Sequence, residues 1–315
     1  MRLMRWLSMA FAIRTEGLSK DYGHGRGLFD LDLEVSVGEV FGYLGPNGAG
    51  KTTTIRLLMD MVRPTRGRAE IFSTDCQATP VQVKRMVGYL PGEMPQWGGL
   101  RGRDVVAYVG GLRGGLDEQR VGDLAERLDL DLGRRYREYS SGNKRKLGLV
   151  LAFMSRSPLL ILDEPTTGLD PLIQQEFYRL VEEEAAGGGT VFLSSHVLSE
   201  VERVCQRVAI LRAGHLVQVA RLDELHNLRY RRLEADLGKE IALEAVRALP
   251  GVEDVTGEGH HLSCAVRGDF GPLLELLGQG QVLNLITHEP SLEEVFLAVF
   301  RDEVEVAGAS PGDNP

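Results

Sequence analysis

One glycine-rich segment constrains the fold of this chain more than any other stretch. It has the sequence Gly45-Pro46-Asn47-Gly48-Ala49-Gly50-Lys51-Thr52-Thr53. An apolar run precedes it, as in a buried strand, and helical periodicity follows it. The spacing G-x-x-x-x-G-K-[ST] in this setting is typical of a loop that binds phosphates. Glycines let backbone N–H groups face the phosphates, and the helix adds its positive dipole end.

Within this loop, Lys51 is expected to reach the β- and γ-phosphates of a nucleotide, and the Thr52 hydroxyl is expected to hold Mg²⁺. The alternative is an ordinary glycine-rich turn. The lysine and the hydroxyl at fixed places in the pattern, between a strand and a helix, favour the phosphate-binding interpretation.

A second candidate site follows the apolar strand Leu159–Leu162, where the chain continues with Asp163 and Glu164. The carboxyl ends of strands in an α/β sheet are where such folds bind ligands. Asp163 is placed to bind Mg²⁺ through water, and Glu164 to act as the general base for the water that attacks the γ-phosphate. An acidic loop after a buried strand is a common alternative, but behind a phosphate-binding loop the catalytic interpretation is favoured.

Charge and cysteine content argue against several classes of function. The formal net charge is −9, with −10 in residues 220–315 and +1 in the rest. Broad nucleic-acid binding or a polybasic membrane anchor would need a basic field, so neither is expected. The cysteines Cys76, Cys205 and Cys264 form no C-x-x-C pair, which favours a reduced cytosolic setting. No apolar run reaches the length of about 18 residues that predicts a membrane span.

The pattern along the chain predicts an α/β fold with a helical insertion. Alternation typical of strands occurs at 11–20 and 28–37, and the run at 159–162 is fully apolar, as in a parallel sheet. Residues 93–155 show helical patterns without strands, which predicts a helical subdomain. Residues 1–9 superficially suggest a signal peptide, but we expect a frayed extension or a start at Met9.

After residue 220 the predicted order becomes β-α-β-β-α-β over 231–286, typical of a small ferredoxin-like α+β domain. A capping box at Ser291 and Glu294 predicts a last helix, and the polar tail is expected to be disordered. We therefore expect three parts: a domain at 1–220 with its helical subdomain at about 93–155, an accessory domain at 221–305, and a tail at 306–315.

Four further motifs accompany these sites in a characteristic order. Tyr22 lies in a turn before the phosphate loop, and the pentapeptide Tyr139-Ser140-Ser141-Gly142-Asn143 opens a helix. Pro165–Asp170 follows the two carboxylates, and Leu193–His196 ends a later strand. With these motifs, residues 10–220 resemble the ATP-binding subunit of ABC transporters. That family has a P-loop NTPase cassette with a mixed sheet core and a helical subdomain.

The resemblance assigns a role to each motif. Tyr22 would belong to the aromatic loop that stacks on adenine, although it could also be a packing residue. Asp170 would belong to the D-loop, and His196 would be the switch histidine at the γ-phosphate rather than an exposed histidine at a helix start. The family uses ATP with Mg²⁺, and hydrolysis would depend on Glu164.

The resemblance also implies partners. Two cassettes, as a homodimer or a paired cassette, would each hold ATP between the phosphate loop of one chain and the signature of the other. The signature residues are Ser140, Ser141, Gly142 and Asn143. A separate transmembrane permease would be required, with this chain peripheral at the cytoplasmic face of the cell membrane and no nucleic acid bound. The segment Pro290–Phe296 and the C-terminal unit resemble the accessory region of drug-exporter ATPases, so export is expected rather than import.

The chain departs from the family pattern at two places. In the signature, usually Leu-Ser-Gly-Gly-Gln, Ser141 replaces a glycine, and the glutamine expected after Pro91 is replaced by Gly92. In the family this glutamine is a ligand to Mg²⁺ and a link to the permease. Either this chain lacks both, or Glu93 or Gln96 supplies them. Two alternative functions follow: a soluble ABC ATPase acting on ribosomes or DNA, and a weakly hydrolysing regulatory module.

Overall fold

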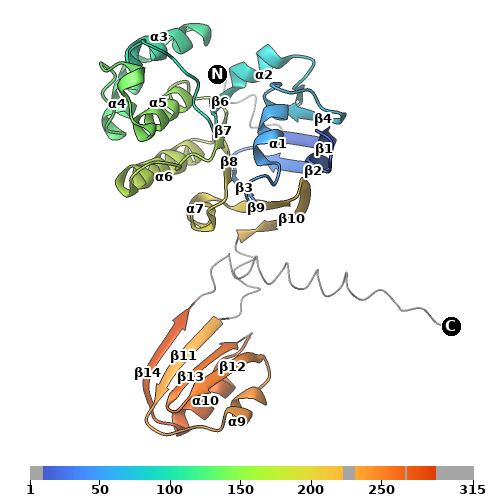
Figure 1. The fold of residues 1–315 in the computed structure, drawn as a ribbon, viewed down its shortest axis with the longest axis vertical. Helices are drawn as coiled ribbons and strands as arrows, with labels where there is room; N and C mark the ends of the chain where they lie inside the picture. Colours follow the sequence, from blue (N-terminus) through green and yellow to red (C-terminus); the bar gives the residue numbers. More distant parts are fainter. Residues whose placement is uncertain (1–9, 223–230, 267, 289–315) are drawn as a thin grey trace, which may run out of the picture. The chain divides into compact units, whose positions relative to one another are not determined.

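The structure is a computed structural model that describes residues 10–222, 231–266 and 268–288. It divides into two compact units, Met1–Leu222 and Asp223–Pro315, shown in Figure 1. The predicted capping box at Ser291 and Glu294, the tail and the expectation for residues 1–9 fall outside the described residues. No helix in the described ranges is long and apolar enough to cross a membrane.

The first unit is built on a six-stranded sheet with the strand order β10-β9-β3-β8-β7-β6. Its strands are β3 (Val40–Leu44), β6 (Val87–Leu90), β7 (Leu159–Asp163), β8 (Thr190–Ser195), β9 (Arg207–Arg212) and β10 (His215–Arg221). All neighbours pair in parallel except β10, which is antiparallel to β9. Every residue of β3, β7 and β8 is buried, as the continuous apolar run of β7 predicted for that strand.

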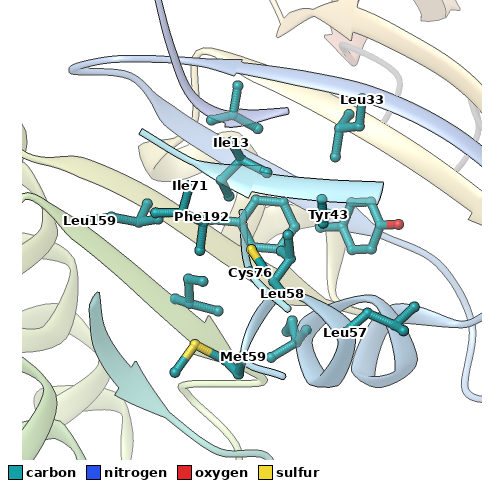
Figure 2. Packing of buried hydrophobic residues seen from close by; sticks show 14 of the residues in the cluster. Ile13, Leu33, Tyr43, Leu57, Leu58, Met59, Ile71, Cys76, Leu159 and Phe192 are labelled. Atoms are coloured by element: carbon teal, nitrogen blue, oxygen red, sulfur yellow. The ribbon is translucent and has the colours of Figure 1, made fainter. Parts of the chain in front are cut away.

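A second, antiparallel sheet has the order β2-β1-β4-β5. Its strands are β1 (Phe11–Asp21), β2 (Gly27–Ser36), β4 (Arg66–Ile71) and β5 (Thr74–Asp75). Figure 2 shows how Ile13 and Leu33 of this sheet and Tyr43 and Phe192 of the central sheet gather with side chains of helix α1 (Lys51–Leu58). The phosphate loop is thus held between a buried strand and a helix that belongs to the same core.

Helix α1 ends at Leu58, although the apolar helical periodicity after the phosphate loop continues to Val62. Asp60 has a φ angle of 46°, in the left-handed region. The N–H of Asp60 donates to the carbonyl of Leu57 at 3.1 Å, and the N–H of Met61 donates to that of Arg56 at 2.8 Å. This is a Schellman-type ending with aspartate in the position that glycine usually fills.

Helices surround the central sheet of the first unit (Figure 1). They are α2 (Pro80–Met86), α3 (Gly102–Leu112), α4 (Glu118–Arg127), α5 (Ser141–Phe153), α6 (Pro171–Ala186), α7 (Leu198–Val204) and the short 3₁₀ helix η2 (Tyr136–Glu138). The segment expected to be a helical subdomain contains α3, η2, α4 and α5, and no named strand occurs in it. The sequence-based α/β fold with a helical subdomain is therefore confirmed.

The second unit confirms the predicted β-α-β-β-α-β order. It contains β11 (Arg231–Leu237), α9 (Leu243–Arg247), β12 (Val252–Glu258), β13 (His261–Val266), α10 (Gly271–Gln279) and β14 (Val282–His288). The strand order β12-β13-β11-β14 is antiparallel throughout and ferredoxin-like. Helix α9 is shorter than the predicted 239–249, because the N–H of Lys239 donates to the carbonyl of Gly280 at 2.9 Å instead of starting a helix.

Candidate functional site

The loop between β3 and α1 has a backbone that only glycines permit. Gly48 and Gly50 have φ angles of 82° and 110°, which disfavour side chains. A Cβ atom on Gly45 would lie 2.6 Å from the carbonyl oxygen of Leu211. The loop leads directly into the first turn of α1, where backbone N–H groups have no partner within the helix and attract anions.

Lys51 provides a buried positive charge at this loop. Lys51 is 5% exposed. The Nζ atom donates to the carbonyl oxygens of Gly45 at 2.5 Å and Pro46 at 3.3 Å, and it lies 3.1 Å from Oε1 of Glu164. A phosphate would therefore compete with Glu164 for an ammonium that is already held at the inner side of the loop.

Asp163 ends β7 and connects this strand with α1 and β8 through hydrogen bonds. The residue is fully buried. Its Oδ2 atom accepts a hydrogen bond from the Thr52 hydroxyl at 3.0 Å, and its Oδ1 atom accepts one from the Ser194 hydroxyl at 2.6 Å. Each carboxylate oxygen is therefore held by one hydroxyl. Burial of Tyr89, together with the negative charge of the nearby Asp163, raises the pKa of Tyr89 to about 12.

Glu164 is the second carboxylate and has a strained backbone, with a φ angle of 50°. Its N–H is held by Ser194, through the carbonyl and the hydroxyl oxygens, both at 3.2 Å. Its Oε2 atom lies 2.6 Å from Nδ1 of His196. Its Oε1 atom is buried and accepts no hydrogen bond of good geometry from the described residues, so it retains capacity to accept one from water.

A cavity of about 1000 Å³ opens beside this cluster. Thr52, Asp163, Glu164 and His196 contribute to its lining. Further along it is lined by residues that include Gly92, Glu93, Met94, Trp97 and Arg145. Of the two candidates for replacing the glutamine absent at position 92, Glu93 lines this cavity, and Gln96 is exposed.

The signature residues begin helix α5. The Ser140 hydroxyl caps the helix by accepting a hydrogen bond from the N–H of Asn143 at 3.2 Å. Ser140 and Ser141 are exposed. A Cβ atom on Gly142 would lie 2.8 Å from the carbonyl oxygen of Gly168, so a larger residue would be crowded there. Among the described residues, no hydrogen bond or ion pair connects this turn with the cluster around Lys51.

The segment after Glu164 is fixed by helix caps and a shared carboxylate. Asp170 is exposed and caps α6, accepting from the N–H groups of Leu172 and Ile173 at 3.1 Å each. Glu200 on α7 accepts hydrogen bonds from the hydroxyls of Thr166 and Ser195, the latter at 2.7 Å. The two loops that carry Asp170 and His196 are therefore anchored to the same residue.

Tyr22 is 51% exposed at the turn between β1 and β2. The Lys20 ammonium lies 5.6 Å from the centre of its ring. The same turn ends at Gly27, whose carbonyl oxygen lies 3.3 Å from the place that a Cβ atom on Gly50 would occupy. The turn thus borders the phosphate loop, and adenine stacking by Tyr22 stays a prediction.

Two residues of the site were not singled out from the sequence. Ser194 holds both Asp163 and the backbone of Glu164, and its place two residues before His196, at the end of a strand, was an available signal. Arg145 reaches the cavity from within α5. Its role has no sequence signal, because a short basic run usually marks a solvated helix face.

The residues present fit ATP and Mg²⁺. A hydroxyl and a carboxylate in contact, Thr52 and Asp163, supply the hard oxygen ligands that Mg²⁺ prefers. The glycine loop, the start of α1 and the buried Lys51 suit a phosphate chain. No group of three or more His, Cys, Asp or Glu side chains suited to a metal occurs in the described part of the chain, and a phosphate-assisted Mg²⁺ site does not require one.

A glycine loop, a buried lysine and two carboxylates meet where parallel strands end, which is the arrangement of P-loop NTPases. Sequence comparison narrows this class, since the family described as ABC transporter matches residues 28–167. The bacitracin transport ATP-binding protein BcrA of Enterococcus faecalis is 34% identical over 73% of this chain and 77% of its own length. The chain belongs to the ABC transporter family, as an ATP-binding and ATP-hydrolysing subunit.

Two further relatives agree with this assignment. The daunorubicin resistance ATP-binding protein DrrA3 of Streptomyces coeruleorubidus is 33% identical, and the match covers 95% of this chain and 99% of that protein. A solved ATP-binding subunit of an ABC transporter is 29% identical, with a TM-score of 0.64, covering 68% of this chain and 92% of its own. The similarity to DrrA3 extends over both units of the chain.

Proposed function

We propose that this chain is the motor of an exporter, in which two cassettes close around Mg²⁺ and ATP and thereby drive a separate transmembrane permease. The chain would act as a peripheral subunit at the cytoplasmic face of the cell membrane. One observation carries the proposal. The cluster around Lys51 is connected by side-chain contacts within the chain, whereas the signature turn is exposed and has none with it.

Each residue of the cluster has a role that its contacts support. Lys51 would bind the terminal phosphates, and the loop from Gly45 to Gly50 would hold the phosphate chain with its N–H groups. Thr52 and Asp163 would hold Mg²⁺, Asp163 through water. When bound, the metal would neutralise charge that develops on the phosphates.

Glu164 is the best candidate for the general base. It would accept a proton from the attacking water at its buried Oε1 atom. Lys51 and His196 hold the two oxygens of this carboxylate in the structure, at 3.1 and 2.6 Å. If phosphate attracts Lys51 away, Oε1 becomes available, while His196 keeps the side chain oriented.

The exposed signature turn supports a shared site. Ser140, Ser141 and Gly142 lie at the N-terminus of α5, a 13-residue helix whose dipole favours an anion there. Because no hydrogen bond or ion pair joins the turn to Lys51 among the described residues, we propose that the turn meets the ATP bound to a second cassette. Asp170 would then lie beside the same interface.

The cavity supports contact with a permease. Away from the carboxylates, its lining includes Met61, Met94, Trp97 and Val109. Met61 is 51% exposed. An apolar lining that opens to the surface can bind a helix from another protein. Movement of such a helix would be transmitted to Asp163, because Asp163 and these apolar residues line one cavity.

The direction of transport is proposed from the relatives. Their names refer to bacitracin transport and daunorubicin resistance. The match to the second of these includes the C-terminal unit. We therefore propose that the permease partner exports an amphipathic or drug-like compound.

The substitution Glu164→Gln tests the function. It keeps the size of the side chain but removes the base, so Mg²⁺-ATP should bind while turnover falls by roughly 10²–10³-fold. The bound protein should become a dimer, which light scattering after size exclusion would detect. Glu182→Gln, which changes an exposed carboxylate of α6, is the matched control and should hydrolyse ATP normally.

The outcomes separate the candidate functions. Normal turnover by Glu164→Gln would show that the base is wrongly assigned. No turnover by the parent chain, even with its permease, would favour a regulatory module. Fractionation with membranes only when a permease is co-expressed would favour the exporter over a soluble ATPase.

A further inference from the structure

Arg145 contacts the backbone at position 92, where the glutamine of the family is absent. This residue lies in the second turn of α5 and is 5% exposed. Its guanidinium donates to the carbonyl oxygen of Pro91 at 2.6 Å and to that of Gly92 at 3.0 Å. One arginine therefore holds the backbone at the position where the family carries the glutamine side chain.

Arg145 lines the same cavity as the catalytic carboxylates. Among the described residues it forms no ion pair within 4.0 Å, and burial lowers its pKa while Asp163 and Glu164 act in the opposite direction. A buried cation without a contacting anion is costly. Its retention here is explained by the field of the two carboxylates and by the two carbonyl acceptors.

Gly92 is in close contact with the same site. A Cβ atom at this position would lie 2.9 Å from Oδ2 of Asp163. That oxygen is held by the Thr52 hydroxyl at 3.0 Å, so it has little freedom to move away. While Arg145 holds the backbone in this position, a glutamine side chain at residue 92 would be crowded by Asp163.

Helix α5 packs closely against the segment that ends at Gly92. A Cβ atom on Gly88 of β6 would lie 2.3 Å from the carbonyl oxygen of Ala152. A Cβ atom on Gly148 would lie 2.5 Å from Leu90 and 2.7 Å from the sulfur of Met94. Two glycines thus bring helix and strand into direct contact, and Arg145 extends this contact to the edge of the nucleotide site.

We propose that Arg145 is a positioning residue that replaces the missing glutamine by coupling α5 to Asp163 through the backbone of Gly92. The start of α5 carries Ser140, so a partner that moves this helix also moves the residue packed against Asp163. The coupling passes through two backbone carbonyls rather than through a side chain at position 92. The inference rests on the proposed ATP-driven function.

Trp97 provides a direct readout of this coupling. It lines the cavity, and its ring lies 6.1 Å from that of Tyr108. The chain has two tryptophans, so Trp6→Phe makes Trp97 the single emitter. With Glu164→Gln added to prevent hydrolysis, Mg²⁺-ATP should change the Trp97 emission, and titration of this change also gives the affinity.

Arg145→Met should uncouple helix α5 from the backbone at Gly92. We expect the Trp97 response at saturating Mg²⁺-ATP to fall at least about threefold, with turnover lowered roughly tenfold in the Glu164 parent, because the coupling of residues in one network reaches this size. Affinity for ATP, read in the Arg145→Met variant from quenching of a fluorescent ATP analogue, should change less than turnover. Arg145→Lys, which keeps the charge but loses the two-pronged geometry, should be intermediate.

A double-mutant cycle with Gly92→Gln distinguishes positioning from general stability. Gly92→Gln should lower turnover in the parent, because the new side chain meets Asp163. Together with Arg145→Met it should restore part of the lost turnover, since the released backbone can move and the glutamine side chain becomes available. A merely structural role for Arg145 predicts additive losses instead.

Arg85→Met, which changes an exposed arginine of α2, is the matched control. The inference is overturned if Arg145→Met and Arg145→Lys both match this control in the Trp97 response and turnover, or if the losses with Gly92→Gln are additive. If Arg145→Met does not fold, the comparison of Arg145→Lys with Arg85→Met decides. Failure of the parent to bind ATP would instead contradict the proposed function.

Discussion

The phosphate-binding cluster and the signature turn both carry polar groups but are held in opposite ways. In the cluster, Lys51, Asp163 and Glu164 contact partners from distant parts of the chain. In the signature turn, the hydroxyl and the carbonyl of Ser140 accept hydrogen bonds from Asn143 and Lys144, three and four residues away. The cluster is organised by the fold, whereas the turn is organised locally and remains exposed.

This difference teaches where the site is complete and where it is open. The buried charge of Lys51 has its partners, Glu164 and two carbonyl oxygens, in place within the folded chain. An exposed helix start can remain hydrated until an anion arrives. The first arrangement defines a nucleotide site in each chain, and the second is available to another chain. Four predictions, in order of decreasing effect, test this division.

The largest effect is expected for Lys51→Ala. The loop loses its buried ammonium, so turnover should fall by roughly 10²–10³-fold or more, with ATP binding strongly weakened. Isothermal titration with Mg²⁺-ATP and phosphate release would measure both. Lys239→Ala, an exposed lysine of the second unit, is the control. Retained binding by Lys51→Ala would contradict the assignment of the cluster.

Mixing two inactive variants tests whether the signature turn acts on a second chain. Ser140→Ala should lower turnover about tenfold to a hundredfold, by the loss of one donor to developing negative charge. In a mixture with Lys51→Ala, a mixed dimer has one site with both residues intact. Activity should therefore rise above that of either variant alone. No rise at any mixing ratio would place the turn and the loop in the same chain's site.

Ser194→Ala should have a smaller effect on the cluster itself. It removes the hydroxyl that donates to Oδ1 of Asp163, and an unpaired buried carboxylate oxygen costs about 1–3 kcal/mol of stability. Urea unfolding would show the loss, and turnover should fall about tenfold, within the range for a displaced catalytic group. Ser199→Ala, at an exposed position of α7, should leave both unchanged. Equal stability of the two variants would show that Asp163 does not depend on Ser194.

The smallest effect is expected where the helical subdomain meets α6. Arg127 lies 2.5 Å from Glu176 and 2.7 Å from Glu183, and its hydrogen bond lowers the pKa of Glu183 below its ordinary value. The contribution of Glu183 is therefore present above its unfolded pKa and is lost as pH falls through its lowered folded pKa.

Arg127→Met should lower the free energy of unfolding at neutral pH by about 0.5 kcal/mol, since the Glu183 side chain is largely exposed. The difference from the parent should shrink in acid, which urea midpoints at both pH values would reveal. Arg137→Met, at an exposed position, is the control. A difference that grows in acid would contradict the sign of the shift.

The fold was predictable because its signals are local. Fully apolar runs mark β3 and β7 as buried parallel strands, and the loop after each then falls at the same edge of the sheet. That logic is enough to bring Lys51, Asp163 and His196 near one another. The end of α1 was not predictable in this way, because aspartate at position 60 takes a left-handed conformation that glycine usually marks.

The contacts that complete the site depend on packing between distant segments. Ser194 meets Asp163 only because β7 and β8 are neighbours in register. Arg145 belongs to a run of basic residues on a helix, and no pattern in that run distinguishes it from Lys144. Its burial follows from the close approach of α5 to β6, which needs Gly88 and Gly148 together.

Glu200 has a consequence for how this cassette can vary. One carboxylate holds Thr166, beside the acidic pair, and Ser195, beside His196. A substitution of Glu200 removes one hydrogen-bond acceptor from each of two buried hydroxyls at once. Viable variants should therefore change these positions in combination, so that Thr166, Ser195 and Glu200 are inherited as a single unit.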